Sequence, residues 1–374
     1  MSGRYRLYGW HLSYFTGKVR CYLRYKGIPF DDVPVDLYTL SVRVRRKTGA
    51  VVMPVLVTPE GEWLQDSSVI LDHLEARFPQ RPIHPADPVQ RFASYLMEAW
   101  GDEWWVPVAM HTRWSYPENY ALFEREAGQH LLPGFPRFLQ RRAVAYVANS
   151  LRAKLHAVGV RPAQFAVLNA WTVQMLDWLD AHFAQHPYLL GPAPTLGDFG
   201  LVGTMAAHLG RDPWPARELI APRRHLRAWI DRMDAEPARP AAQAPGGLPA
   251  GPVPSSLAPV YRTIFDEFTQ LLQGGLHELA AARPQLPPGK AFARGLGDVR
   301  IATPFGSFSR TALPYTLWMA QRTLDVWHAM PPAEQQAVRA WAQPLGGDAF
   351  LALDIPRLER RALRVAPAEP SSPA

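Results

Sequence analysis

The residues that could bind a ligand form two short groups, and the first is the pair Asp66 and Ser67 at the start of an expected helix. The main-chain amide and the hydroxyl of Ser67 can bind a carboxylate there, and the helix dipole favours an anion at that end. The carboxylate of Asp66 can pair with an amino group. Asp and Ser are also the residues that most often cap a helix. The pair therefore predicts either a binding site for a zwitterionic group, with a carboxylate and an ammonium, or a plain helix cap.

The second group is the loop from His11 to Tyr14, which leads into another expected helix. The hydroxyls of Ser13 and Tyr14 can hydrogen-bond an anion, although Ser13 could equally cap the helix. His11 could act as a base, but a structural or solvent-facing histidine is the commoner case. Cys21 lies beyond the first turn of that helix, where it is expected to pack as a small apolar residue.

Cysteine content limits the chemistry, because Cys21 is the single cysteine of the chain. A disulfide within the chain and a cysteine-based zinc site are excluded, and no metal is expected. No apolar run approaches the ~18 to 20 residues of a membrane-spanning helix. The N-terminus has no apolar signal region, so a cytoplasmic protein is expected.

The formal net charge of +7 comes with two dense basic clusters. They consist of Arg43, Arg45, Arg46 and Lys47, and of Arg357, Arg360, Arg361 and Arg364. Each cluster is short and no known nucleic-acid motif surrounds it, so both are interpreted as solvated helix faces. Neither nucleic acid nor a membrane is therefore expected as a partner.

Both groups of candidate residues lie within residues 5–78, where strand and helix signals alternate. The elements of this segment must therefore position them. The expected order is β-α-β-α-β-β-α, with strands at 6–8, 30–35, 54–57 and 62–64 and helices at 16–26, 37–48 and 67–77. Val19, Tyr22 and Leu23 have the spacing of one helix face. Gly27 is expected to end that helix.

The sequence from residue 87 onward predicts one helix after another. Asp87 and Pro88 are suited to cap and open the first of them. Further helices are expected near 136–158, 162–186, 195–209 and 222–234, and then a hairpin near 298–308 and a helix from 313. We divide the chain into residues 1–80, 87–235, a Pro/Ala/Gly-rich linker at 236–259 and a mostly helical extension at 260–365.

Five local motifs, in order and at family spacing, resemble the glutathione transferase superfamily over residues 4–235. They are Leu7–Arg20 (LYGWHLSYFTGKVR), Lys26–Phe30 (KGIPF), Met53–Leu56 (MPVL), Gln65–Ile70 (QDSSVI) and Pro194–Phe199 (PTLGDF). The first four resemble the active-site loop with its flanking elements, the link into strand two, the cis-proline loop and the acidic–Ser pair. The fifth resembles the capping box that opens a buried helix in this family.

The resemblance implies a thioredoxin-like N-terminal domain, an all-α second domain, and glutathione as co-substrate. The loop spacing most resembles the zeta class and places Ser13 at the position that activates the thiol. Tyr14 is the competing donor, because other classes use Tyr. A hydrogen bond to the sulfur would lower the pKa of the thiol, which is ~8.5 when free. The remaining alternative is that neither residue activates it.

The resemblance also implies how glutathione is held. The main chain of Met53, before a cis peptide bond to Pro54, would pair with the cysteinyl unit. Asp66 would take the α-amino group and Ser67 the α-carboxylate. Two departures affect the substrate side: Tyr14 follows Ser13 where many members have Pro, and the usual Asn-Pro-x-Gly before the cis-proline is absent.

The expected function is thiol transfer from glutathione to an electrophilic small molecule, as in detoxification. A non-catalytic adaptor with the same fold is one alternative, since fold does not fix function. A glutathione-dependent lyase or reductase is another, but these normally use a loop cysteine. The family is usually dimeric, and an aromatic first helix of the second domain, spanning Trp100 to Trp114, suits an apolar two-fold contact. The extension is expected to fold back and narrow the electrophile pocket.

Overall fold

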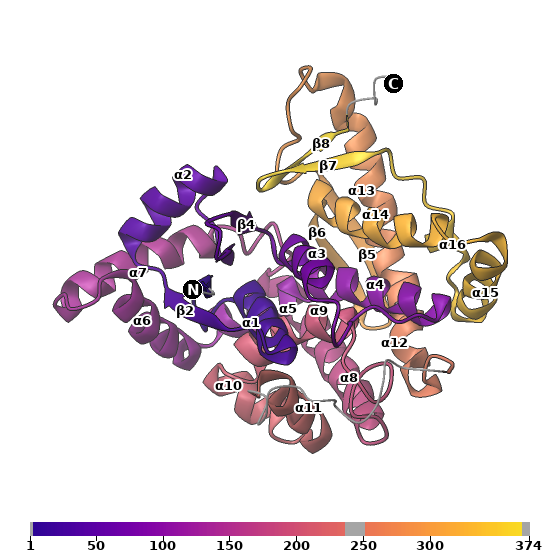
Figure 1. Cartoon of the computed structure of the whole chain (residues 1–374), viewed down its shortest axis with the longest axis horizontal. Coiled ribbons are helices and arrows are strands. Elements are labelled where there is room, and N and C mark those ends of the chain that lie inside the picture. Colours follow the sequence, from indigo (N-terminus) through magenta and orange to yellow (C-terminus); the bar gives the residue numbers. More distant parts are fainter. Residues whose placement is uncertain (1–2, 236–250, 369–374) are drawn as a thin grey trace.

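The computed structural model describes residues 3–235 and 251–368, and its N-terminal part is built on a four-stranded sheet. The strand order is β2-β1-β3-β4, for β1 (Tyr5–Gly9), β2 (Phe30–Pro34), β3 (Val55–Val57) and β4 (Trp63–Gln65). β1 runs parallel to β2 and antiparallel to β3, which is antiparallel to β4. Helices α1 (Tyr14–Lys26) and α3 (Ser67–Arg77) pack against this sheet (Figure 1). The expected thioredoxin-like order is confirmed.

Helix α1 buries the apolar residues whose spacing predicted one helix face. Val19, Tyr22 and Leu23 are fully buried. Gly27 ends the helix with φ of +66°, and its N–H donates to the carbonyls of Arg24 and Leu23. Such a backbone conformation carries no steric cost for glycine. The predicted helix end is therefore confirmed.

The expected helix at 37–48 is divided into a π-helical turn, η1 (Thr39–Val44), and α2 (Arg45–Thr48). Leu40 and Val44 are buried in a cluster that includes Phe123 and Val144 from the helical domain. Arg43, Arg45, Arg46 and Lys47 are exposed. The first basic cluster is thus a solvated helix face, as expected.

The second domain is helical throughout. Its elements are α4 (Pro88–Glu103), α5 (Val106–Ser115), α6 (Pro117–Leu131), α7 (Arg137–Arg152), η2 (Pro162–Gln164), α8 (Phe165–Phe183), α9 (Leu196–Thr204), η3 (Met205–Leu209), α10 (Pro213–Pro215), η4 (Ala216–Ile220) and α11 (Arg224–Asp234). Thr195 and Asp198 form the predicted capping box of α9. The expected single helix from Trp100 to Trp114 is wrong, because α4 ends at Glu103 and Pro107 lies in the first turn of α5. Proline is favoured in a first turn and disrupts a helix interior.

The extension contains helices and two hairpins. Its elements are η5 (Ser255–Leu257), α12 (Ala258–Thr263), η6 (Ile264–Phe268), α13 (Thr269–Ala282), η7 (Arg283–Gln285), β5 (Asp298–Thr303), β6 (Gly306–Thr311), α14 (Pro314–His328), α15 (Pro332–Ala342), η8 (Gln343–Leu345), α16 (Asp348–Leu351), β7 (Leu358–Arg361) and β8 (Arg364–Pro367). The β5–β6 hairpin and the start of α14 confirm two predictions. The interpretation of the second basic cluster as a helix face is wrong, since Arg360, Arg361 and Arg364 lie on β7 and β8.

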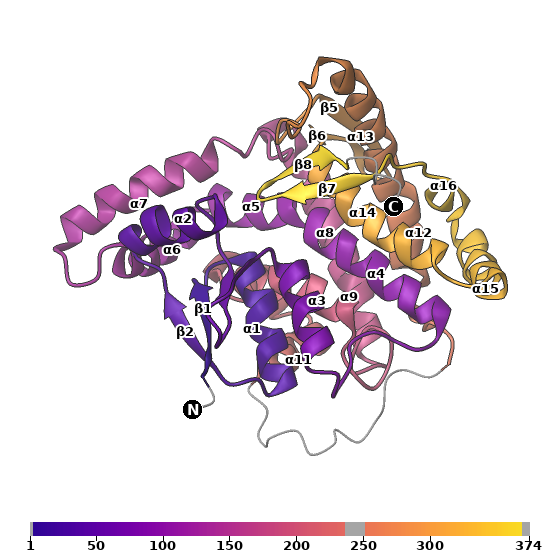
Figure 2. The same ribbon diagram turned by 45° about the horizontal axis from the view of Figure 1, so that its top comes forward.

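The extension folds back onto α4. Helices α14 and α15 both contact α4, and Figure 2 shows them on the same side of it. Trp104 has Phe268 and Phe308 of the extension beside its ring, with centroids 6.4 and 6.3 Å away. Trp100 and Trp105 are also fully buried within the chain. The aromatic surface on which we based a two-fold contact is therefore covered by the chain itself.

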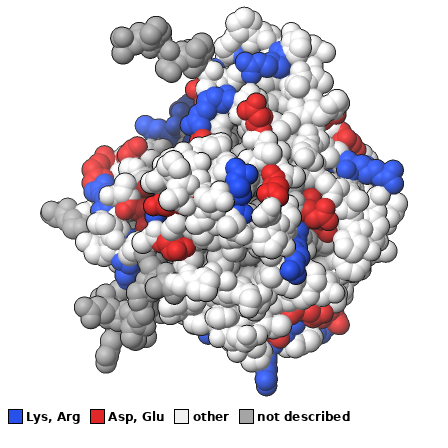
Figure 3. Space-filling model, turned by 90° about the vertical axis from the view of Figure 1, so that its right-hand side faces the viewer, with Lys and Arg blue, Asp and Glu red and all other residues white. Residues whose placement is uncertain are grey.

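The surface of the extension side carries charges of both signs. Figure 3 shows Lys and Arg interspersed with Asp and Glu on this face, with wide uncharged areas between them. Mixed charges of this kind are typical of a solvated surface. Within the described residues, no helix is long and apolar enough to cross a bilayer.

Candidate functional site

Strand register brings the predicted site residues to one edge of the sheet. Tyr8 near the end of β1 pairs with Val55 at the start of β3, and Val55 pairs with Gln65 at the end of β4. The loop after β1, the residues just before β3 and the residues just after β4 therefore meet at this edge. The Met53–Pro54 peptide bond, just before β3, is cis, as the resemblance implied.

The loop after β1 is held by two hydrogen bonds. The indole of Trp10 donates to the Val35 carbonyl over 2.9 Å. Arg113 of α5 donates to the Leu12 carbonyl over 2.6 Å, and a two-bond ion pair with Asp212 fixes this guanidinium. Both contacts are buried, so the loop position is defined by packing from both domains.

Ser13 is the N-cap of α1. Its Oγ accepts a hydrogen bond from the Thr16 amide over 3.4 Å, and it is half-buried. Within the described part of the chain, the Ser13 hydroxyl donates no hydrogen bond. Its proton is available to an anion, and the adjacent helix N-terminus favours negative charge there.

Tyr14 points away from that position. Its side chain is buried and its hydroxyl donates to the Gly101 carbonyl of α4. Burial raises the pKa of Tyr14 well above its usual value, and the nearby Asp102 adds to this. The phenol thus joins the two domains, and of the two candidate donors only Ser13 has a free proton.

Asp66 and Ser67 lie at the N-terminus of α3. Asp66 has φ of +89°, a conformation that costs a non-glycine residue of order 1–3 kcal/mol. Its Oδ1 accepts from the amides of Ser68 and Val69 over 3.1 and 3.3 Å. Ser67 is 6% exposed, and its hydroxyl makes no hydrogen bond within the described residues. Asp66 therefore caps the helix and leaves the Ser67 hydroxyl available.

Two residues that we did not predict also contact this part of the site, the N-terminus of α3 with Asp66 and Ser67, which we call the corner. The hydroxyl of Tyr315, on α14, donates to Oδ2 of Asp66. Arg360, on β7, donates to Oε1 and to the main-chain carbonyl of Gln65 over 2.6 and 3.2 Å. Arg360 belongs to the cluster interpreted as a solvated face. Tyr315 carried no signal in the sequence.

A buried ion network lies beneath this corner. Lys18 of α1 is fully buried and donates to Glu98, Asp102 and Ser68 over 2.7, 2.6 and 3.0 Å. Burial raises the pKa of Asp102 to about 7 although Lys18 opposes the shift. Burial acts in the same direction on Glu98, but the charges of Lys18 and Arg322 outweigh it and lower the pKa to about 2. The network joins both domains and, through Arg322 of α14, the extension.

His11 and Cys21, the two other residues considered in the sequence for chemistry near this loop, have structural surroundings. His11 lies 3.4 Å from Asp32, with burial lowering its pKa. Cys21 is buried, and burial raises the pKa of its thiol to about 12. A thiol of that kind is not a nucleophile at neutral pH. Within the described residues, no cluster of three metal-ligating side chains is present.

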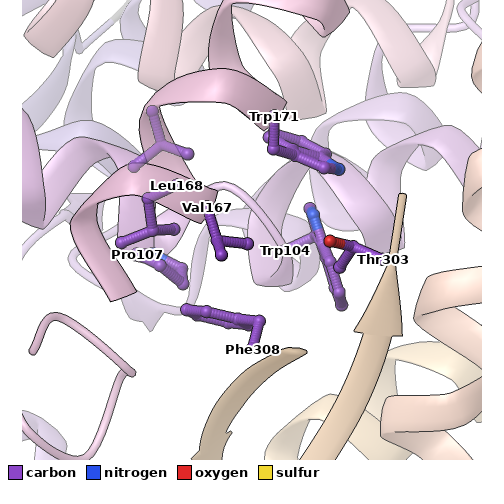
Figure 4. A pocket seen from close by; sticks show the side chains of 8 residues that line it. Trp104, Pro107, Val167, Leu168, Trp171, Thr303 and Phe308 are labelled. Carbon is purple, nitrogen blue, oxygen red and sulfur yellow. The ribbon is translucent and has the colours of Figure 1, made fainter. Parts of the chain in front are cut away.

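A small apolar cavity lies where the extension meets the helical domain. Trp104, Trp171, Val167 and Phe308 line it together with four other residues (Figure 4). Its volume is about 10 Å³, roughly the space of one water molecule. The extension contributes Thr303 and Phe308 to the lining, and this cavity is too small to hold a substrate.

A thioredoxin-like sheet domain followed by an all-helical domain defines the class of protein. Residues 7–82 match the family model of the glutathione S-transferase N-terminal domain, and residues 172–232 match that of the C-terminal domain. The chain therefore contains both domains of the glutathione S-transferase family, over the residues that the two models match. Neither match extends beyond residue 232, so the extension lies outside both domains.

Relatives in this family are distant. Maleylacetoacetate isomerase from Pseudomonas aeruginosa is 31% identical over 91 residues, which are 23% of this chain and 43% of that protein. The chain thus spans less than half the length of that relative. Glutathione S-transferase 3 from Zea mays is 28% identical over 261 residues, 68% of this chain and 98% of that protein. A glutathione S-transferase structure from Methylobacterium radiotolerans, in complex with glutathione sulfonate, is 24% identical with a TM-score of 0.39, covering 63% of this chain and 92% of that one.

Proposed function

We propose that this protein binds glutathione and activates its thiol for transfer to an electrophilic small molecule. The observation that carries the proposal is the register that gathers Ser13, Pro54 and the Asp66–Ser67 pair at one sheet edge. In this arrangement the main chain of Met53 pairs with the cysteinyl unit and α3 anchors the γ-glutamyl end. A cytoplasmic location and a homodimer remain predictions, and a dimer would need a surface other than α4.

Ser13 is the group that we assign to the thiol. A hydroxyl that donates to the sulfur stabilises the thiolate over the thiol, which lowers the pKa. The free proton of Ser13 and the start of α1 support this role. A lyase or reductase is disfavoured because the loop contains no cysteine and Cys21 is buried.

The adaptor alternative has one observation in its favour. The carboxylate of Asp66, which the resemblance assigns to glutathione, is already hydrogen-bonded to Tyr315 of the extension. An adaptor would keep the fold and use other surfaces. The two functions differ in whether bound glutathione loses its proton more readily than free glutathione.

Ultraviolet titration of the bound thiolate separates the two functions. In the wild type the thiol should titrate well below ~8.5, the value of a free thiol. Ser13→Ala should return the pKa toward that value and lower turnover of an aryl halide ~100-fold, the scale for one lost donor to an anion. Binding should survive, since Ser67 and the start of α3 hold the other end.

Two control variants test whether the effect of Ser13→Ala comes from the loss of the Ser13 hydroxyl at the sulfur. Asp87→Ala removes the N-cap of α4, whose carboxylate accepts from the Gln90 amide over 2.9 Å, outside the candidate site. It should cost stability as Ser13→Ala does, without changing the titration. Tyr14→Phe should also leave the titration unchanged. If glutathione binds but its thiol titrates near ~8.5 in both the wild type and Ser13→Ala, the adaptor function is favoured.

A further inference from the structure

The carboxylate of Asp66 is already satisfied by groups of the protein. Oδ1 accepts from two helix amides, and Oδ2 accepts from the Tyr315 hydroxyl. The Nε of Arg360 lies 3.9 Å from Oδ2, which makes an ion pair rather than a hydrogen bond. The two side chains are 6% and 18% exposed, so water screens this pair weakly. A ligand ammonium would have to compete with a cation that is already in place.

Arg360 is held in this position by its hairpin. Its Nη1 donates to the Gln65 side chain over 2.6 Å and to the Ala362 carbonyl over 2.9 Å, and its Nη2 to the Gln65 carbonyl over 3.2 Å. The hairpin is itself fixed, because Gln321 of α14 exchanges two hydrogen bonds with the main chain of Leu358. The guanidinium is therefore a fixed part of the corner.

The Ser67 side of the corner, in contrast to the Asp66 side, has a group that is still available to a ligand. The Ser67 hydroxyl is unpartnered within the described residues, and it lies in the first turn of the 11-residue helix α3. The positive end of this helix favours an anion. Since Arg360 compensates the charge of Asp66, this pair carries no net negative charge to attract an ammonium group. The corner as a whole favours a carboxylate.

We infer that this site recognises the α-carboxylate of its ligand and gains little from an α-ammonium group. The inference rests on the proposed function, because it concerns the γ-glutamyl end of the same glutathione site. It assigns the ligand class as thiols that carry a carboxylate at this position, with or without the amino group. Ser67 and the start of α3 bind the carboxylate, and Arg360 sets the selectivity through its charge.

Three ligands test the selectivity by isothermal titration calorimetry on the full chain. They are glutathione, glutaryl-Cys-Gly, which lacks only the α-amino group, and 4-aminobutyryl-Cys-Gly, which lacks only the α-carboxylate. Glutaryl-Cys-Gly should bind within ~3-fold of glutathione. 4-Aminobutyryl-Cys-Gly should bind ~10-fold or more weakly, the scale for losing a hydrogen bond to a charged group.

Arg360→Gln tests the residue responsible. It removes the cation and keeps a hydrogen-bonding end, so Asp66 becomes free to attract an ammonium. Glutathione should then bind ~10-fold or more tightly than glutaryl-Cys-Gly. Arg360→Lys keeps the charge and should retain the wild-type order of the ligands. Arg357→Gln is the matched control, because its partner Asp325 lies on an exposed surface, 2.6 Å away.

The outcomes are distinguishable. If the wild type binds glutathione but rejects glutaryl-Cys-Gly ~10-fold or more, the inference is wrong while the proposed function stands. The same holds if Arg360→Gln leaves the order of the ligands unchanged. If Arg360→Gln tightens all three ligands equally, Arg360 blocks the site and does not select. If the wild type binds none of the three, the proposed function fails and the inference fails with it.

Discussion

Glu267 provides a direct test of how the extension is attached to the helical domain. It lies on η6, is 2% exposed, and its Oε2 accepts from the indole N–H of Trp171 on α8 over 2.7 Å. Burial raises the pKa of this carboxyl from 4.5 to about 8. The side chain is therefore predominantly neutral at pH 7 in the folded protein and ionised in the unfolded chain.

The sign of the pH dependence follows from proton binding. Between about pH 4.5 and 8 the folded state holds a proton that the unfolded state has lost, so this residue makes the free energy of unfolding fall as pH rises. At 1.36 kcal/mol per pKa unit, the full effect is about 5 kcal/mol, reached near pH 8 and constant above it. At pH 5 it is below about 1 kcal/mol.

Glu267→Gln removes this titration and preserves an oxygen acceptor for Trp171. Urea unfolding at pH 5, 7 and 8.5 measures the free energy of unfolding of both proteins. The variant should resemble the wild type at pH 5 and exceed it by about 4 kcal/mol or more at pH 8.5, because the pH-dependent cost is absent. Asp266→Asn is the control: it replaces the exposed neighbour and leaves Glu267 and its burial unchanged, so most of the pH-dependent cost should remain.

A difference between Glu267→Gln and the wild type that is the same at all three pH values would refute this reasoning. It would mean that the carboxyl ionises as freely in the folded protein as in the unfolded chain. Water would then reach Glu267, and the contact between η6 and α8 would not form in solution.

Two further predictions concern the contacts that join the sheet domain and the extension to α4. Lys18→Met leaves the buried Glu98 and Asp102 without their shared cation, and should lower the free energy of unfolding by about 3–5 kcal/mol in urea titrations at pH 7. Arg77→Met, which breaks an exposed pair with Glu60, should cost far less, and equal losses would contradict the role of burial. Truncation before residue 251 removes the rings that cover Trp104, so the product should bind a hydrophobic dye and be less soluble; a shortened chain as soluble and as heat-stable as the full chain would show that the extension is an independent module.

Local signals in the sequence were sufficient to predict the order of strands and helices in the sheet domain. The spacing of Val19, Tyr22 and Leu23, the glycine at position 27 and the Met53-Pro54 dipeptide each act over a few residues. Such signals depend on backbone sterics and on one buried face, which a sequence pattern states directly. The residues of the candidate site came instead from the resemblance of four local motifs to the glutathione transferase superfamily.

The hairpin that carries Arg360 could not be predicted in the same way. β7 and β8 are joined by Ala362 and Leu363, and Ala362 has φ of +54°. Tight hairpin turns are usually marked by Asn-Gly or Asp-Gly, which tolerate positive φ, so the usual signal is missing. An arginine-rich segment of this length also has no apolar pattern of its own. Its structure depends on contacts with residues far away in the sequence.

The contact between Arg360 and Gln65 at the candidate site could not be predicted from the sequence for the same reason. The two residues are 295 positions apart, and nothing near either one indicates the other. Tyr315 reaches Asp66 over a separation of 249 positions, again without a local signal. The resemblance therefore supplied the candidate glutathione residues, whereas the side chains of the extension that contact them could not be predicted from the sequence.

The strained backbone at Asp66 links the site to the extension. A φ of +89° persists only where surrounding contacts determine it, and here they come from two sides. The amides of α3 hold one carboxylate oxygen, and Tyr315 of the extension holds the other. A ligand that binds at α3 and leaves the Tyr315 and Arg360 contacts in place therefore stabilises the docked extension, and by linkage the docked extension strengthens binding of that ligand equally. A ligand whose ammonium group displaces these contacts has the opposite effect. The region outside the two family domains is thus thermodynamically part of the candidate site.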